Sequence, residues 1–153
     1  MQTPRLQFRN LPATHARDIL SRNHLGRLAF TFRDRVDIRP ISYKFKKDWI
    51  FGRTAPGEKI LTIRHHRWVA FQVDEVEDDR NWVSVIVHGP LYLLDEAEGQ
   101  DQTELQERAR VAVQEMDPLA FTEEDPVPER SILFGVAVEH LSGREARIGS
   151  SLP

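Results

Sequence analysis

The chain has 153 residues, 40% of them hydrophobic and 29% charged, which fits one globular domain over residues 1–153. Because it contains no cysteine, it cannot form disulfides, thiolate metal sites or a catalytic thiol, and no apolar run approaches the ~18 residues of a membrane-spanning helix. We expect a cytoplasmic protein that does not enter a membrane, and the net charge of -3 argues against non-specific binding of nucleic acid.

The two halves of the chain carry opposite charge. Residues 27–67 contain eleven Lys and Arg against four Asp and Glu, whereas residues 68–130 contain four against seventeen. This pattern favours an anion bound by the first segment. The alternative is that oppositely charged faces solvate the fold or meet across a dimer interface, and charge alone leaves both open.

The first predicted elements are a short helix and a strand. The helix covers residues 14–22, with Thr14 as its N-cap. Residues 28–32 alternate large apolar with smaller side chains, which is typical of a half-buried strand. A turn follows at 34–35.

A second strand is predicted over 36–45 and a third over 49–51. Pro40 has no backbone donor, so it belongs at a strand edge, bulge or kink, where a ligand could approach the backbone. Apolar residues at helical spacing then indicate a helix that begins within a few residues of Thr54 and ends near His66.

Two long strands are predicted next, over 68–75 and 82–95, with a bulge or bend at Gly89-Pro90. A helical composition over 96–116 is followed by an acidic, proline-rich loop at 117–130. A last strand covers 132–141, and we expect the tail beyond Gly143 to be mobile.

These patterns predict five or six antiparallel strands with two or three helices and no βαβ alternation. The fold class is therefore mainly β with α, a closed or split antiparallel β-barrel with peripheral helices. A dinucleotide-binding parallel sheet is not expected, because the chain lacks G-x-G-x-x-G, G-x-x-x-x-G-K-[ST] and G-x-S-x-G motifs.

Residues 53–59 contain the groups of an anion site. Thr54 offers a hydroxyl, Arg53 a two-pronged charge-assisted pair and Lys59 a point charge, beside the unpaired N–H groups of a helix start. The alternative is an ordinary helix cap with solvated charges.

Other candidate sites have weaker support. His65 and His66 are adjacent and so diverge on a helix, and we expect no metal site. Trp49 and Phe51 on basic strands suggest stacking on single-stranded nucleic acid, but the acidic remainder of the chain disfavours this option.

Five motifs occur in an order and spacing that resemble one group of proteins: GRLA (26–29), PISY (40–43), FGRTAPGEKI (51–60), VAFQVDE (69–75) and WVSVIVHG (82–89). The chain is similar to the pyridoxamine 5'-phosphate oxidase-like family of FMN-binding split barrels, in the nitroimidazole-resistance-type branch. The resemblance covers about residues 14–95. It departs from that branch at Ser42, where Asn is more common, and at Glu58, where a small residue is more common.

The resemblance implies a homodimer with two FMN molecules at the subunit interface. The FMN phosphate would contact Arg53, Thr54 and Lys59. The isoalloxazine ring would lie along Pro40, Ile41, Ser42 and Tyr43, and its border would include Trp82 and Ser84, from this subunit or from its partner. Trp82 could equally be an interface aromatic, and Tyr43 could be a barrel residue.

The leading functional hypothesis is an FMN-dependent oxidoreductase that acts on a small molecule, in which the flavin performs the redox chemistry. The catalytic residues and the substrate stay open. Oxidation of pyridoxamine phosphate is not favoured, because Arg144 and Arg147 lie near the carboxyl terminus without a recognisable motif. The alternatives are a flavin-binding or sensing module without turnover, and a split-barrel relative that uses haem or deazaflavin.

Overall fold

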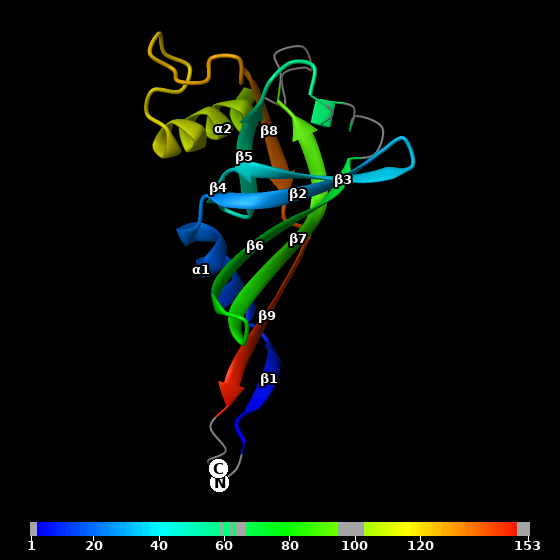
Figure 1. The fold of residues 1–153 in the computed structure, drawn as a ribbon. Helices are drawn as coiled ribbons and strands as arrows, with labels where there is room; N and C mark the ends of the chain where they lie inside the picture. Colours follow the sequence, from blue (N-terminus) through cyan, green and yellow to red (C-terminus); the bar gives the residue numbers. More distant parts are fainter. Residues whose placement is uncertain (1–2, 59, 62, 64–66, 95–102, 150–153) are drawn as a thin grey trace.

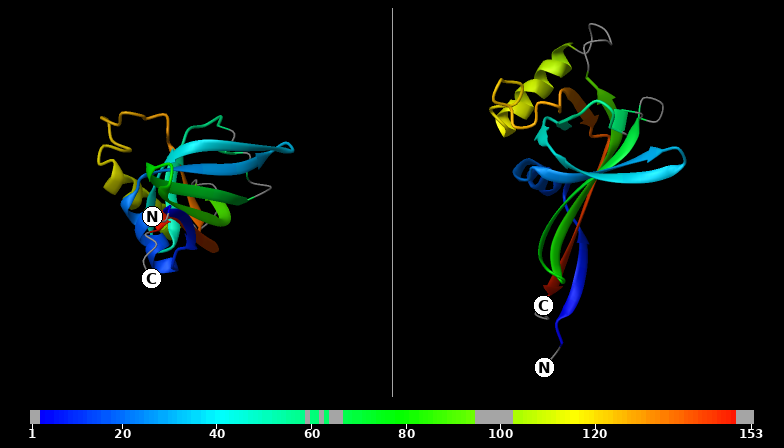
Figure 2. Two further views of the ribbon diagram at one scale, coloured as in Figure 1. Left: turned by 60° about the horizontal axis from the view of Figure 1, so that its bottom comes forward. Right: turned by 45° about the horizontal axis from the view of Figure 1, so that its top comes forward.

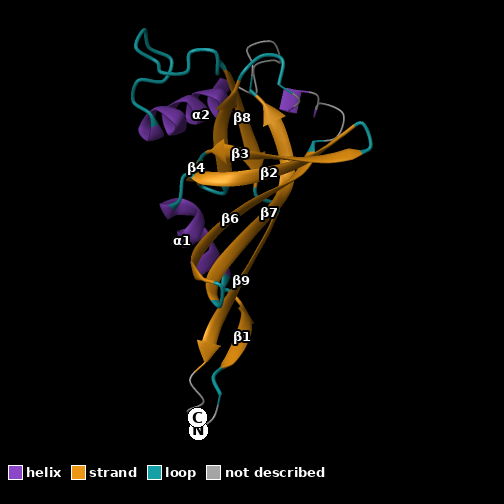
Figure 3. Cartoon of the chain, viewed as in Figure 1, coloured by secondary structure: helices purple, strands orange, loops and turns teal. Residues whose placement is uncertain are grey.

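The computed structural model describes residues 3–58, 60–61, 63, 67–94 and 103–149. Within these residues a single antiparallel sheet curls around the core without closing, and helices pack against it (Figures 1 and 3). The predicted split β-barrel with peripheral helices is confirmed. The strands are β1 Arg5–Asn10, β2 Leu25–Phe32, β3 Arg35–Ser42, β4 Lys44–Lys46, β5 Trp49–Thr54, β6 Trp68–Asp78, β7 Asn81–Leu93, β8 Ile132–Ala137 and β9 His140–Gly149, and the helices are α1 Ala13–Arg22 and α2 Thr103–Met116.

The strand order is β3-β2-β6-β7-β8-β5-β4, and β9 pairs with both β7 and β1. Strand β7 changes partner along its length, because Trp82 to His88 pair with β9 and Leu91 to Leu93 pair with β8. A Cβ at Gly89 would lie 1.7 Å from the carbonyl oxygen of Ala137, so only glycine fits this close approach. The predicted break at Gly89-Pro90 is therefore the point where β7 passes from one part of the sheet to the other.

The main core lies inside the curled sheet and beneath α1. Alternate residues of β2, β6 and β7 point inward, and Ile19 and Leu20 of α1 are fully buried against them. A second cluster lies under α2, where Ala112 and Val113 pack with Phe51 and Leu133. Helix α2 is thus a surface helix over β5 and β8, as predicted. The prediction placed its start at 96, but residues 95–102 lie outside the described residues.

The opposite face of the sheet is exposed and unusually apolar. The cross-strand registers of β3, β2, β6, β7, β9 and β1 show that the residues of these strands that point away from the core share one face of the sheet. We call this the outer face. Its exposed large apolar residues are Leu6, Phe8, Leu25, Val36, Ile38, Trp68, Val76, Ile86 and Ile148. Contiguous exposed apolar surface on a protein commonly marks an interaction site.

Strands β1 and β9 form a two-stranded ribbon that extends away from the rest of the molecule (Figures 1 and 2). The sequence did not predict β1, and β9 continues to Gly149 where a mobile tail beyond Gly143 was expected, so that expectation is wrong. Every residue of β1 is exposed, although Leu6 and Phe8 alternate with polar residues as in a strand, so its apolar residues lie on the outer face and not in the core.

One local prediction is wrong and another is met in part. Thr14 does not cap α1, because the N-cap position belongs to Pro12, which makes no side-chain capping bond. The helix expected after Thr54 begins later and is tighter than expected: residues 56–57 form a turn, and the described residues 60, 61 and 63 are in a 3₁₀ helix. Its i to i+3 bonds include Leu61 N–H to the Glu58 carbonyl. Gly57 explains the later start, because its φ of 86° is incompatible with a right-handed helix.

Candidate functional site

A cavity of about 470 Å³ lies between the edge strand β3, the end of β5 and the loop that follows α2. Pro40, Ile41 and Ser42 of β3 and Arg53 and Thr54 of β5 line it. The remaining wall comes from the turn after β5 and from the 117–130 loop, through Ala55, Glu58, Ile60, Asp117, Val127 and Arg130.

The structure therefore brings together five of the nine predicted cofactor residues, from two separate motifs: Pro40, Ile41, Ser42, Arg53 and Thr54. Lys59 lies outside the described residues. Strand β3 ends the strand order, so one edge of its backbone is unpaired within the described sheet. Pro40 lies on this edge strand, as its missing donor required.

Thr54 is the buried polar residue of the cavity, with 7% of its surface exposed. Its backbone is in the β5–β8 ladder opposite Ile132. Among the described residues its hydroxyl has no hydrogen-bond partner, and a buried hydroxyl without one is unfavourable. The cavity thus offers a polar group that a ligand can satisfy.

Arg53 lines the cavity, but carboxylates from the 117–130 loop already engage its guanidinium. Its two terminal nitrogens donate to both oxygens of Asp125, at 2.6 and 3.1 Å, and one of them also donates to Asp117 at 3.1 Å. The Arg53 side chain is 7% exposed, and its guanidinium carbon lies 5.2 Å from the centre of the Phe121 ring. A phosphate would have to compete with these partners for Arg53.

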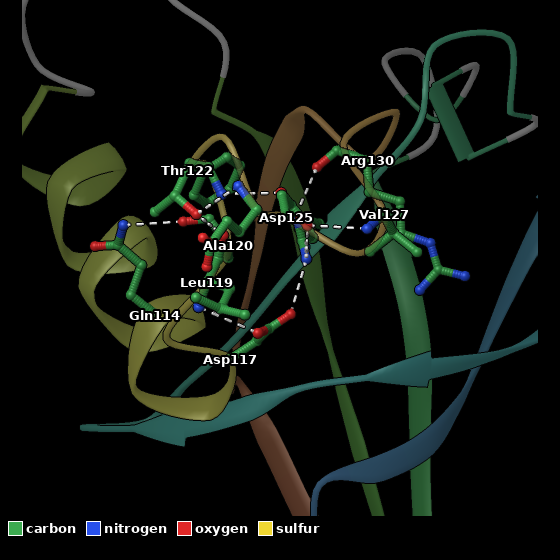
Figure 4. Close-up of polar contacts among 11 residues, drawn as sticks. Gln114, Asp117, Leu119, Ala120, Thr122, Asp125, Val127 and Arg130 are labelled. Atoms are coloured by element: carbon green, nitrogen blue, oxygen red, sulfur yellow. Dashed lines mark hydrogen bonds and ion pairs between the residues drawn. The ribbon is translucent and has the colours of Figure 1, made fainter.

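Asp125 is the centre of this network (Figure 4). It accepts hydrogen bonds from Arg53 and from the backbone N–H groups of Phe121 and Val127. The Arg53 hydrogen bond is the largest of the effects that hold the pKa of Asp125 well below its ordinary value, and the two backbone donors add to it. The Asp125 carboxylate is therefore a fixed negative partner that orders the loop.

A second ion pair spans the cavity from β3 to the turn after β5. Arg39 donates to Glu58 at 3.4 Å, and Arg39 also lies 3.9 Å from Asp37. The negative charge that Glu58 adds to the proposed phosphate region is thus balanced by a neighbouring arginine. This pairing accounts for how the chain accommodates Glu58 in place of a small residue.

Arg130 is a cavity residue that sequence reasoning missed. It is the only basic residue in the 117–130 loop, which could have served as a signal. Among the described residues its guanidinium has no carboxylate partner, and Figure 4 shows its side chain pointing away from the contacts of the loop.

Tyr43, predicted to lie along the flavin ring, is not among the residues that line the cavity. Tyr43 is fully buried, its hydroxyl donates to the Leu20 carbonyl at 2.7 Å, and its ring meets Phe71 edge-on. Burial raises the pKa of Tyr43 above its ordinary value. It is a core residue that joins β3 to α1, as its alternative interpretation stated.

Trp82 and Ser84 lie on the outer face and are not among the residues that line the cavity of their own chain. The Ser84 hydroxyl accepts a hydrogen bond from Gln72 at 3.0 Å, and the Trp82 ring lies 6.3 Å from the ring of Phe8.

The described residues contain no group of three or more His, Asp or Glu that could hold a metal ion. His65 and His66 are outside the described residues. In the part of the chain that is described, no helix is both long and apolar enough to cross a membrane.

An unclosed antiparallel barrel with a cavity between an edge strand and a peripheral helix defines the split-barrel class of proteins. Within that class, this chain belongs to the pyridoxamine 5'-phosphate oxidase family, whose model matches residues 12–145.

Solved structures support the same fold. An FAD-binding protein from Mesorhizobium loti is 26% identical, with a TM-score of 0.71 over 92% of this chain and 98% of that chain. The FAD-binding protein of Mycobacterium smegmatis is 23% identical, with a TM-score of 0.65 over 91% and 100% of the two chains. A putative 5-nitroimidazole antibiotic resistance protein from Bacteroides thetaiotaomicron is 13% identical, with a TM-score of 0.67 over 92% and 89%.

A curated relative matches a shorter stretch. An uncharacterised protein of Rhizobium meliloti is 32% identical over 71 residues, which are 46% of this chain and 47% of that protein. The chain therefore matches about half the length of this relative.

Proposed function

We propose that this protein binds FMN in the cavity between β3 and β5 and uses it as an oxidoreductase on a small molecule. The observation that carries the proposal is buried Thr54, whose hydroxyl has no partner among the described residues and which lines a cavity beside an unpaired strand edge. Family membership and the FAD-binding protein of Mesorhizobium loti support a flavin as the ligand.

The cavity residues fit the two ends of a flavin mononucleotide. At about 470 Å³, the volume lies within the usual range of small-molecule sites. The backbone edge at Pro40 to Ser42 offers hydrogen-bonding groups to the polar rim of an isoalloxazine ring, and the Thr54 hydroxyl offers one to a phosphate. Both ends of such a ligand would therefore replace water contacts with protein contacts.

When bound, the flavin supplies hydride or electron transfer. The residues of this chain bind and orient it, and the 117–130 loop and the Arg39–Glu58 pair line the cavity that holds it. We further propose a cytoplasmic location, which the absence of cysteine supports.

We also propose that the protein is a homodimer formed through the outer face, with the flavin at the interface. A self-complementary contact between two copies would bury the exposed apolar residues of this face, of which Val36 is 79% and Ile38 61% exposed. Trp82 and Ser84 lie on the same face, so a second copy could place them beside the ligand of its partner.

Flavin absorption and fluorescence test the proposal. We expect purified protein to be yellow or to bind added FMN saturably, and to bleach under anaerobic conditions with NADH or NADPH. Flavin binding without bleaching by either donor would favour a non-catalytic flavin-binding module. Protein that ignores FMN but takes up haem or a deazaflavin would contradict the proposal.

A further inference from the structure

The cavity has one exposed cation that lacks a counterion among the described residues. Three arginines line it, and two of them are paired, Arg39 with Glu58 and Arg53 with Asp125 and Asp117. The third, Arg130, has an exposed side chain that points away from the contacts of its own loop (Figure 4). An anion in this cavity can therefore pair with Arg130 without breaking an existing ion pair.

The contacts of Arg53 fix the backbone on which Arg130 lies. Arg53 binds Asp125, and Asp125 accepts the backbone N–H of Val127 at 3.0 Å. The carbonyl of Val127 then accepts the N–H of Arg130 at 3.0 Å, and an Arg53 nitrogen lies 3.5 Å from the Arg130 carbonyl oxygen. Arg53 is thus connected to the backbone of Arg130 in two ways, through the hydrogen bonds of Asp125 and Val127 and through its own contact with the Arg130 carbonyl.

Strand register places Arg130 near the unpartnered hydroxyl of the cavity. Thr54 is paired directly with Ile132, which follows Arg130 by two residues. Thr54 and Arg130 therefore belong to the same end of the neighbouring strands β5 and β8, and both line the cavity. A hydroxyl and a guanidinium at this position form a site for one anionic group.

We propose that Arg130 supplies the charge that binds the phosphate of the flavin, and that Arg53 is a positioning residue that holds Arg130 in place. This inference rests on the proposed flavin binding and assigns the phosphate contact to a residue outside the 53–59 motif. Thr54 is the hydrogen-bonding neighbour of Arg130. The acidic loop, through Asp125, keeps Arg53 from contacting the ligand directly.

Riboflavin, which lacks the phosphate, provides the matched ligand for a test. We expect Arg130→Gln to weaken FMN binding by at least about tenfold in fluorescence titrations and riboflavin binding by less than about twofold. Arg80→Gln removes the same charge from an exposed turn and should change neither affinity. Equal effects of Arg130→Gln on the two ligands, or no effect on FMN, would overturn the assignment.

The role of Arg53 is tested by non-additivity. Arg53→Gln is combined with Asp125→Asn, so that the Asp125 carboxylate is not left without its arginine partner. In this background Arg130 has lost its support, so adding Arg130→Gln should change the ratio of FMN to riboflavin affinity by less than about threefold. If Arg53 contacted the phosphate itself, the two losses would add, and the positioning role would be refuted.

Failure of flavin binding and failure of the Arg130 contact give different results. If wild-type protein binds neither FMN nor riboflavin, both the proposed function and the role of Arg130 are refuted. Wild-type protein that binds FMN while Arg130→Gln binds it equally well removes only the inference.

Discussion

Replacing Thr54 with valine should strengthen the fold of the ligand-free protein and weaken its binding of FMN. Valine has nearly the same shape as threonine, and it removes the hydroxyl of a residue that is only 7% exposed and whose hydroxyl has no partner among the described residues. A buried hydroxyl without a hydrogen bond costs about 1–3 kcal/mol in proteins, so its removal should raise the free energy of unfolding by about 1 kcal/mol or more. In a chain of this size each kcal/mol corresponds to a Tm increase of about 2–4 °C.

The same substitution removes a hydrogen bond to a charged group of the ligand. Such bonds contribute about 1.5–3 kcal/mol, which corresponds to an increase in the Kd for FMN of about 10- to 150-fold. Urea unfolding of the ligand-free protein and fluorescence titration with FMN measure the two effects. Thr14→Val removes an exposed hydroxyl from α1, where valine and threonine have similar helix propensity, and should change neither quantity.

The opposite signs make this test specific. A Thr54→Val variant that is less stable without ligand and binds FMN as tightly as wild type would refute the reasoning, because its hydroxyl would then have a structural partner and no ligand contact.

Three further predictions concern the core, the outer face and the loop network. Tyr43→Phe removes the bond to the Leu20 carbonyl and should lower the free energy of unfolding by about 1–2 kcal/mol in urea titrations, and an unchanged midpoint would contradict the assigned bond. Ile86→Lys should shift the protein from dimer to monomer in sedimentation, whereas Val111→Lys, on α2, should not, and a dimer that persists in both would exclude the outer face as the interface. The pKa of Asp125 is lower in the folded protein than in the unfolded chain, so its ionised carboxylate stabilises the fold above the ordinary carboxyl pKa, and this stabilisation is lost as the pH falls. The difference in urea midpoint between wild type and Asp125→Asn should therefore shrink below about pH 4. A difference that stays constant with pH would refute the pairing.

The sequence was sufficient for the barrel because most of its strands bury one face. Val69, Phe71 and Val73 alternate with polar or small neighbours, and the structure places them in the core as that period requires. Strands β1 and β9 differ from these core strands. They pair with each other although they lie at opposite ends of the sequence, and β1 has no buried residue. The local alternation of Leu6 and Phe8 with polar residues is compatible with a strand, but it does not reveal its pairing partner.

The candidate site was predictable where it depends on backbone and not where it depends on long-range charge. Pro40 indicated an edge strand from its chemistry alone, and it lies on one. The engagement of Arg53 could not be foreseen, because Asp125 is 72 residues away and reaches it only through the path of the 117–130 loop. The helix expected beside Thr54 begins only after Gly57, because the positive φ of Gly57 does not fit a right-handed helix, and the described residues 60, 61 and 63 form a 3₁₀ helix.

The central claim is that the cavity between β3 and β5 holds a flavin, and a crystal structure of the protein grown with FMN tests it most directly. We predict electron density for the ring along Pro40 to Ser42 and for the phosphate within hydrogen-bonding distance of the Thr54 hydroxyl. FMN bound elsewhere on the protein, or a cavity without flavin at saturating FMN, would contradict the account.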